Sequence, residues 1–169
     1  MNITLIGMPG VGKSFLGKKL AEKLNYKFLD IDELIEKNAG LKLQKIIDDF
    51  GDDEFLKIEE RTILELGKIN NCVIAPGGSM IYCSGAMNLL KRNSVVVFLD
   101  TSYKNIEKRL ENRTSRGIVG LKKNGLKKLY NERLIMYKKY ADITIKLSEN
   151  RNINIIIDDI IQQIKNLEK

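Results

Sequence analysis

Short apolar stretches alternate with longer segments of helical periodicity along this chain. The apolar stretches are typical of strands and lie at 3–6, 26–30, 72–75, 95–99 and 143–145. The helical patterns cover 13–24, 31–38, 43–50, 53–69, 103–111, 125–140 and 153–167. In the first helix, Leu16, Leu20 and Leu24 recur every fourth residue and mark one apolar face. Strands that alternate with helices predict βαβ units and an α/β fold with a parallel sheet.

The chain length of 169 residues fits one domain, and we expect 1–169 to form it. No internal repeat or low-complexity linker marks a boundary. The segment 112–124 is rich in Gly, Arg and Lys and has weak periodicity. A connection of this length inside a compact domain is uncommon unless it has a function. We therefore interpret it as a mobile basic lid, with an ordinary surface loop as the alternative.

Composition narrows the functional classes. The chain contains no histidine, which excludes Ser-His-Asp triads and His-liganded zinc. Only Cys72 and Cys83 are present, which is typical of a reducing cytoplasm. No apolar run reaches the ~20 residues of a membrane span, and the N-terminus does not resemble a secretory signal. We expect a cytoplasmic protein with no membrane partner.

The net charge of +7 comes from 29 basic and 22 acidic side chains. A basic chain favours a phosphate-rich ligand, either a nucleotide or a nucleic acid. The lysines are scattered along the chain, however, and aromatic residues are few. Solvated helix faces explain most of the charge, so we expect no nucleic-acid partner.

The strongest motif follows the first predicted strand. Residues 7–14 read G-M-P-G-V-G-K-S and match the phosphate-loop pattern at every fixed position, between a strand and a helix. Glycines let the backbone N–H groups curl around phosphate oxygens, and the helix start adds its dipole. Lys13 is expected to project into a water-filled loop and reach the β- and γ-phosphates, and Ser14 to ligate Mg²⁺. The motif predicts nucleoside triphosphate binding with ATP as co-substrate.

A missing motif and the chain length exclude some classes of nucleotide-hydrolysing protein. A GTPase also needs an N-K-x-D segment, which the chain lacks, and motor ATPases need a longer chain. A small-molecule or nucleotide kinase is the most economical interpretation. A non-catalytic nucleotide-binding protein that uses its basic surface on nucleic acid is a further interpretation.

Two carboxylates, Asp30 and Asp32, close the second predicted strand. In an extended chain they point to one face, toward the phosphate crevice at the carboxyl ends of the strands. One could orient Mg²⁺ and the other accept a hydroxyl proton. The alternative is that either residue only caps the helix that follows.

Further candidates lie at the same sheet edge and around the lid. The turn Pro76-Gly77-Gly78-Ser79 offers bare backbone that a ligand can approach closely, or it is a plain strand–helix turn. Cations near the γ-phosphate stabilise the charge that develops in phosphoryl transfer. The candidate cations are Arg109, Arg113, Arg116 and Arg133.

Taken together, these motifs resemble the shikimate kinase family, within the nucleoside-monophosphate-kinase-like P-loop group. The resemblance rests on the segments 7–14, 30–36, 51–59 and 76–78. It also rests on Arg109, Arg116, Arg133 and Tyr137. It implies a P-loop NTPase three-layer sandwich with a five-stranded parallel sheet in order 2-3-1-4-5, helices on both faces and a lid loop. It also implies a substrate-binding region at 31–60 and a lid at 112–124.

On the nucleotide side, the resemblance implies that Lys13 and Arg116 stabilise the transferring phosphoryl group. Ser14 and Asp30 would hold Mg²⁺, and Arg109 would lie against the adenine. The implied nucleotide contacts are Gly10, Val11, Gly12, Lys13, Ser14, Phe15, Arg109 and Arg116.

On the acceptor side, the resemblance implies that Asp32 binds ring hydroxyls and takes the proton of the attacking one. Gly77 and Gly78 would contact the substrate through backbone, and Ser79, at the third family glycine, adds a hydroxyl to the substrate wall. Arg133 would bind the substrate carboxylate. The implied activity is ATP-dependent phosphorylation of a small-molecule substrate, shikimate, by a protein we expect to be a monomer.

Four positions differ from the family pattern. A carboxylate-binding arginine is replaced by Leu56, and Pro76, Ser79 and Gly117 stand where threonine, glycine and proline are usual. Loss of one charge-assisted contact lowers affinity by roughly 10- to 150-fold. A different hydroxy acid or polyol as acceptor is therefore the alternative to shikimate.

Overall fold

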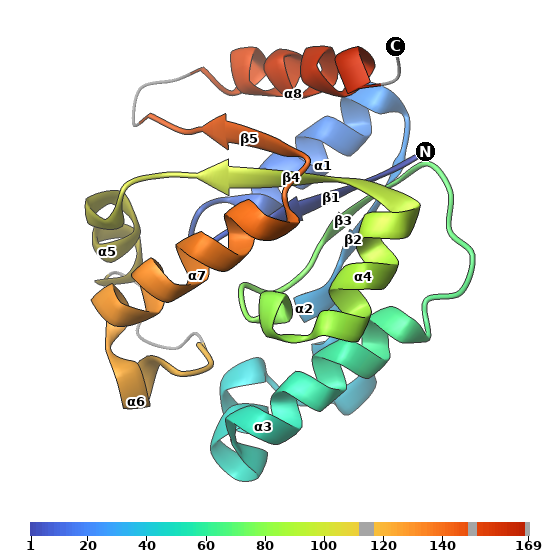
Figure 1. Cartoon of the computed structure of the whole chain (residues 1–169). Helices are drawn as coiled ribbons and strands as arrows, with labels where there is room; N and C mark the ends of the chain where they lie inside the picture. The colour runs from blue at the N-terminus through green and yellow to red at the C-terminus, as the bar shows by residue number, and fades with distance from the viewer. Residues whose placement is uncertain (112–116, 149–151, 168–169) are drawn as a thin grey trace.

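A five-stranded parallel sheet forms the centre of the computed structural model, which describes residues 1–111, 117–148 and 152–167. The strand order is β2-β3-β1-β4-β5, as Figure 1 shows. Each strand pairs in parallel with its neighbours. The strands are β1 (Asn2–Ile6), β2 (Lys27–Asp30), β3 (Cys72–Ala75), β4 (Ser94–Asp100) and β5 (Ile143–Lys146). The predicted fold class and strand order are confirmed.

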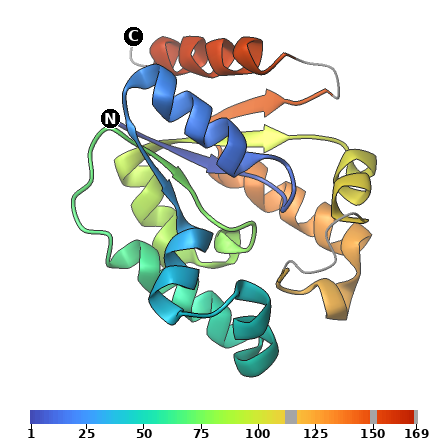
Figure 2. The ribbon, with the colours of Figure 1, turned by 180° about the vertical axis from the view of Figure 1, so that it is seen from behind.

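Helices cover both faces of the sheet, which makes three layers. In Figures 1 and 2, α1 and α8 lie on one face and α4 and α7 on the other, while α2 and α3 extend beyond β2. None of the helices among the described residues combines the length and apolar character that a membrane crossing needs. The helices are α1 (Lys13–Leu24), α2 (Ile31–Ala39), α3 (Leu43–Leu64), α4 (Ser84–Asn93), α5 (Tyr103–Glu111), α6 (Leu121–Asn124), α7 (Leu126–Tyr140), α8 (Ile153–Leu167) and the 3₁₀ turn η1 (Met80–Tyr82).

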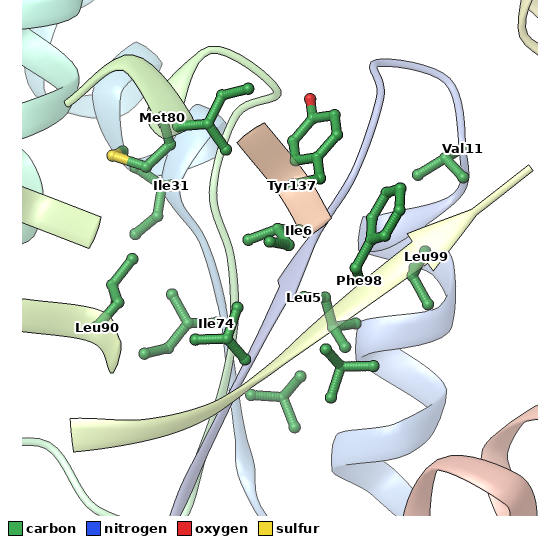
Figure 3. Close-up of a cluster of buried hydrophobic side chains, with 14 of the residues drawn as sticks. Leu5, Ile6, Val11, Ile31, Ile74, Met80, Leu90, Phe98, Leu99 and Tyr137 are labelled. Carbon is green, nitrogen blue, oxygen red and sulfur yellow. The ribbon is translucent and has the colours of Figure 1, made fainter. Parts of the chain in front are cut away.

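The core lies on both sides of the central strands. Every residue of β1 is buried, as expected for a strand that helices cover on both faces. Figure 3 shows Leu5 and Ile6 of β1 among side chains from β3 and β4. The ring of Phe98 stacks on Tyr137 of α7 at a centroid distance of 5.1 Å. This contact fixes α7 against the sheet.

Three helical segments differ from the sequence prediction, and one of them, α6, lies within 112–124, where the sequence predicts a loop. The helix α4 is absent from that prediction, because it starts at Ser84-Gly85 and buries only Ala86, Met87 and Leu90, too few positions for a clear period. The predicted break at Gly51 is a kink with φ 83° and ψ 169° inside α3, so the patterns 43–50 and 53–69 join there, and the helix ends at Leu64.

Candidate active site

The phosphate loop joins the buried strand β1 to α1 at the carboxyl end of the sheet. Gly10 and Gly12 have φ values of 81° and 108°, a region that side-chain-bearing residues rarely adopt. Gly12 caps α1 without a side chain, so the backbone N–H groups at the start of the helix face the loop. The strand–loop–helix context that the motif requires is present, and the loop can hold a phosphate chain.

Lys13 does not project into an open loop, and that part of the prediction is wrong. Its side chain is buried, with 6% of its surface exposed. The ammonium donates to the carbonyl oxygens of Gly7 at 2.8 Å and Met8 at 3.3 Å. The loop's own carbonyls therefore hold the charge that the sequence assigns to phosphate, because a buried ammonium needs acceptors.

The other predicted nucleotide contacts surround this loop. Arg109 of α5 donates to the carbonyl of Val11 at 2.9 Å and approaches that of Gly10, so its guanidinium lies against the loop backbone. Phe15 is 56% exposed at the start of α1 and presents an aromatic surface beside the loop. The predicted Arg113 and Arg116, with the rest of 112–116, lie outside the described residues.

Asp30 caps α2, which is one of the two roles that the sequence left open, and its second oxygen contacts Ser14. Its Oδ1 caps α2 by accepting from the backbone N–H groups of Asp32 and Glu33. Its Oδ2 accepts from the Ser14 hydroxyl at 2.5 Å. A hydroxyl and a carboxylate oxygen at this distance fit the hard-oxygen ligand set that Mg²⁺ prefers.

Asp32 lies in the first turn of α2 rather than in the strand. The expected extended geometry at this position is therefore wrong, because the chain becomes helical at Ile31. Asp32 nevertheless lines a small cavity of about 20 Å³ together with Gly77, Gly78 and Arg133. We refer to it as the acceptor cavity, and it lies where the loops after β1, β2 and β3 meet. Its full lining is Pro9, Asp32, Leu43, Phe55, Glu59, Gly77, Gly78, Ser79, Gly117, Ile118, Val119 and Arg133.

A much larger cleft, of about 1100 Å³, runs beside this cavity. Ser14, Asp30 and Asp32 line it from one side, and the start of α3 lines it from the other. Asp32 and Gly117 border both hollows. The magnesium candidates and the proposed base are thus reached from the same open space.

The sequence predicts that a ligand can approach the turn after β3 closely. In the structure, side chains of the protein itself pack against this turn. A Cβ on Gly77 would stand 2.3 Å from Oε1 of Glu59, and one on Gly78 would stand 2.7 Å from Pro9 Cδ. Neither position has room for a side chain. Tyr137 donates to the carbonyl of Gly78 at 2.7 Å and holds the turn from the opposite side.

Arg133 is fully buried in the wall of the acceptor cavity. Its Nη2 donates to the carbonyl of Val119 at 2.7 Å, and its guanidinium lies over the ring of Tyr82 at 5.3 Å from the centroid. A buried guanidinium with donors in a fixed fork suits a planar carboxylate. The Val119 carbonyl takes one of those donors in this structure.

Glu59 lines the acceptor cavity, although the sequence analysis gave it no role beyond its place in the segment 51–59. It is fully buried, and its Oε2 accepts from the Ser79 hydroxyl at 2.5 Å. Burial and the neighbouring Asp32 charge raise the pKa of this carboxyl to about 8. A signal was present, since Phe55, Glu59 and Ile63 recur every fourth residue on the buried face of α3. An acidic residue within the apolar face of a helix indicates a buried carboxyl with a specific role, because unpaired acids are rarely buried.

Two of the positions that depart from the family pattern now have a structural setting. Leu56 packs against the core and is not among the described residues that line the acceptor cavity, where Phe55 lies instead. A Cβ on Gly117 would stand 2.8 Å from Ile47 and 3.0 Å from the backbone nitrogen of Gln44. The glycine therefore allows the chain to pass close to α3.

The parallel sheet, the phosphate loop, and the carboxylates and buried arginine beside it define a P-loop kinase of small molecules. The shikimate kinase family model matches residues 9–165. The chain therefore belongs to the shikimate kinase family and is an ATP-dependent small-molecule kinase.

Individual relatives agree with this assignment along the whole chain. A shikimate kinase of Sulfurihydrogenibium sp. is 37% identical over 97% of this chain and 98% of its own length. One of Persephonella marina is 34% identical over 97% and 99%. Among solved structures, shikimate kinase from Acinetobacter baumannii in complex with shikimate has a TM-score of 0.85 at 29% identity, over 98% of this chain and 93% of that one. Shikimate kinase from Aquifex aeolicus also reaches 0.85 at 29% identity, over 99% and 98%.

Proposed function

We propose that this chain transfers the γ-phosphoryl group of ATP to a hydroxyl of shikimate, giving shikimate 3-phosphate for aromatic amino-acid biosynthesis. The observation that carries the proposal is the acceptor cavity, where the carboxylate of Asp32 and the buried guanidinium of Arg133 converge beside the phosphate loop. A polyhydroxy acid needs both groups, one for a hydroxyl and one for the carboxylate. Membership of the family favours shikimate over another hydroxy acid or polyol.

The proposed reaction is an in-line displacement. The acceptor hydroxyl oxygen bonds to the γ-phosphorus, the bond from that phosphorus to the β–γ bridging oxygen breaks, and ADP leaves. Asp32 accepts the proton of the hydroxyl. Lys13 moves from the Gly7 and Met8 carbonyls to the phosphate oxygens, and its charge offsets the charge that develops there. We also assign Arg116 a stabilising role, as the resemblance implies.

We assign magnesium binding to Ser14 and Asp30. The ion would supply charge neutralisation at the phosphate oxygens. The hydroxyl–carboxylate pair supports this assignment, because both oxygens already face one another at the start of α1. Asp30 would then continue to cap α2 through its other oxygen.

Acceptor recognition follows from the buried arginine. We assign the substrate carboxylate to Arg133, whose Nη2 would exchange the Val119 carbonyl for a carboxylate oxygen. The backbone of Gly77 and Gly78 would line the opposite side of the acceptor. The cavity of about 20 Å³ must widen for this, so we assign 117–124, with 112–116, to a lid that moves on binding.

The test is a coupled assay of ADP release with purified protein, Mg²⁺ and ATP, using shikimate and a panel of other hydroxy acids and sugars. We expect shikimate to give the highest kcat/KM. Phosphorylation must be confirmed by mass of the product, since ATP hydrolysis alone also releases ADP. Faster turnover of a different acceptor, or none with shikimate, would overturn the proposal.

We further propose that the protein acts as a cytoplasmic monomer without a nucleic-acid partner. The two cysteines are free and buried, which suits a reducing compartment. Many surface lysines are already paired with acids, among them Lys18 with Glu33 and Lys122 with Asp48. Such pairing leaves less positive charge for a phosphate backbone.

A further inference from the structure

Glu59 presents an unusual combination of burial and incomplete hydrogen bonding. Its carboxyl is fully buried on the face of α3 that packs against the turn after β3. One oxygen, Oε2, accepts from Ser79, whereas Oε1 has no hydrogen-bond partner within the described part of the chain. A buried polar atom without a partner is costly, so its retention calls for an explanation.

The unpartnered oxygen faces the acceptor cavity. Oε1 of Glu59 and Oδ1 of Asp32 both lie within 3 Å of the point where a Cβ on Gly77 would stand. Both residues line the acceptor cavity, as Arg133 does. This oxygen therefore lies close to the carboxylate of Asp32, the proposed base, at the acceptor cavity.

The hydrogen bond from Ser79 determines which carboxyl oxygen of Glu59 lies unpartnered, among the described residues, at the acceptor cavity. The Ser79 hydroxyl donates to Oε2, and this bond is compatible with a neutral carboxylic acid in which Oε2 is the carbonyl oxygen and the proton lies on Oε1. An O–H on Oε1 is a donor that can meet an oxygen of a ligand in the cavity. Glycine at position 79, as the family resemblance leads one to expect, would leave the carboxyl without this hydroxyl.

We propose that Ser79 is a positioning residue of the acceptor site, which holds Oε2 of Glu59 so that Oε1–H donates a hydrogen bond to an oxygen of the bound acceptor. This inference rests on the proposed function. It gives the cavity a third polar side-chain contact beside Asp32 and Arg133, and it makes Ser79 and Glu59 one recognition unit. No bond is made or broken at Glu59, and its proton stays on Oε1.

The surroundings favour the neutral carboxyl that this role requires. Desolvation is the main cause that raises the pKa of Glu59 to about 8, and the negative charge of Asp32 on α2 acts in the same direction. The Ser79 bond and the charges of Arg133 and Lys13 act in the opposite direction and are weaker together. The other titratable groups that sense Glu59 are Cys83, next to η1, and Tyr137 of α7.

The first experiment compares Ser79→Ala with wild type in the shikimate assay. We expect KM for shikimate to rise at least about fivefold and kcat to stay within about threefold, because a contact made before and during transfer acts mainly on binding. Ser79→Thr keeps the hydroxyl, and its KM should lie closer to that of wild type. The matched control is Ser84→Ala, an exposed serine of the same segment, which should change neither constant.

The second experiment measures KM against pH. In wild type, KM for shikimate should rise above about pH 8, where Glu59 ionises and Oε1 ceases to be a donor. Glu59→Gln cannot ionise, so its KM should be flat across that range whatever its absolute value. Ser79→Ala should move the rise to higher pH, because the lost hydroxyl bond had favoured the ionised form.

Each outcome bears on one proposal only. Equal KM values for Ser79→Ala and wild type, or an alkaline rise that persists in Glu59→Gln, would overturn the inference while shikimate turnover kept the proposed function. Absence of shikimate turnover in wild type would instead overturn the function. Thermal unfolding of each variant checks that it is folded, and Ser79→Gly repeats the test if the alanine variant is not.

Discussion

At the scale of single residues, one side chain often serves both the architecture and the chemistry. Lys13 is the clearest case, since its ammonium closes the phosphate loop by donating to Gly7 and Met8. The same ammonium is the charge that the proposed reaction needs at the phosphates. Loss of the side chain should therefore affect both the loop and the transfer.

Lys13→Ala should reduce kcat for shikimate phosphorylation by about a hundredfold or more, because the phosphoryl group loses the ammonium that the proposed reaction brings to it. The two buried carbonyls also lose their donor, so the melting temperature should fall by a few degrees. Coupled ADP release and thermal unfolding measure the two effects. A variant with wild-type turnover would remove Lys13 from the mechanism.

Asp32→Asn retains the shape of the side chain and removes the proton acceptor. We expect kcat to fall by about a hundredfold or more, on the usual scale of general-base catalysis, with ATP affinity unchanged. Nucleotide titration by calorimetry and the coupled assay measure these separately. Unaltered acceptor turnover would mean that Asp32 contributes only to the first turn of α2.

The buried Glu59 carboxyl also predicts a pH dependence of stability. Its pKa is about 8 in the folded protein against 4.5 for the unperturbed group. Between these pH values the unfolded chain loses a proton that the folded chain keeps, so stability falls as pH rises from about 4.5 to about 8. Glu59→Gln should lack this loss, which is on the order of a few kcal/mol. Urea unfolding of both proteins at pH 5 and pH 8 measures the difference, and parallel curves would contradict it.

At the scale of elements, α3 contacts the described part of the proposed lid, 117–124. Asp52 accepts from the backbone N–H of Gly120 at 2.9 Å, and Asp48 pairs with Lys122 of α6. The kink at Gly51 lies between these two acids. The sequence predicted helical segments on both sides of a break at this glycine, but only the structure shows that they carry these two contacts.

Gly51→Ala should destabilise the protein by about 1–3 kcal/mol through the backbone alone. A Cβ there meets nothing within 4 Å, whereas φ 83° with ψ 169° is a conformation open to little besides glycine. Chemical unfolding measures the loss. Lys57→Ala, on the exposed surface of the same helix, is the control and should stay within about 0.5 kcal/mol. A neutral Gly51→Ala would mean that the kink is not required.

At the scale of the whole molecule, the parallel sheet brings loops that are distant in sequence to one edge. The sequence alone could place 7–14, Asp30 and 76–79 together for this reason, since parallel strands end on the same side. It could not find the pairing of Glu59 with Ser79, because no local pattern relates a helix position to a turn twenty residues away. It also could not foresee that Lys13 folds back on its own loop.

The helix α8 closes the opposite part of the molecule and packs on α1 and β5. Ile160 is fully buried there, whereas Ile155 on the same helix is 56% exposed. Ile160→Ala should cost about 2–5 kcal/mol of stability through lost burial and the cavity it leaves. Because α8 is far from the acceptor cavity, kcat of the folded fraction should not change. Ile155→Ala is the matched control, and equal losses in the two variants would contradict the packing.

Both carboxylate oxygens of Asp30 accept hydrogen bonds, and this restricts which residues can replace it in evolution. One oxygen caps the N-terminus of α2, and the other accepts a hydrogen bond from Ser14. Two selective pressures therefore act on a single short side chain. Asparagine could still cap the helix but would bring no charge to the phosphate side, and glutamate would bring the charge on a side chain too long to cap well. A library of all substitutions at this codon, selected for growth without aromatic amino acids, should return aspartate almost alone.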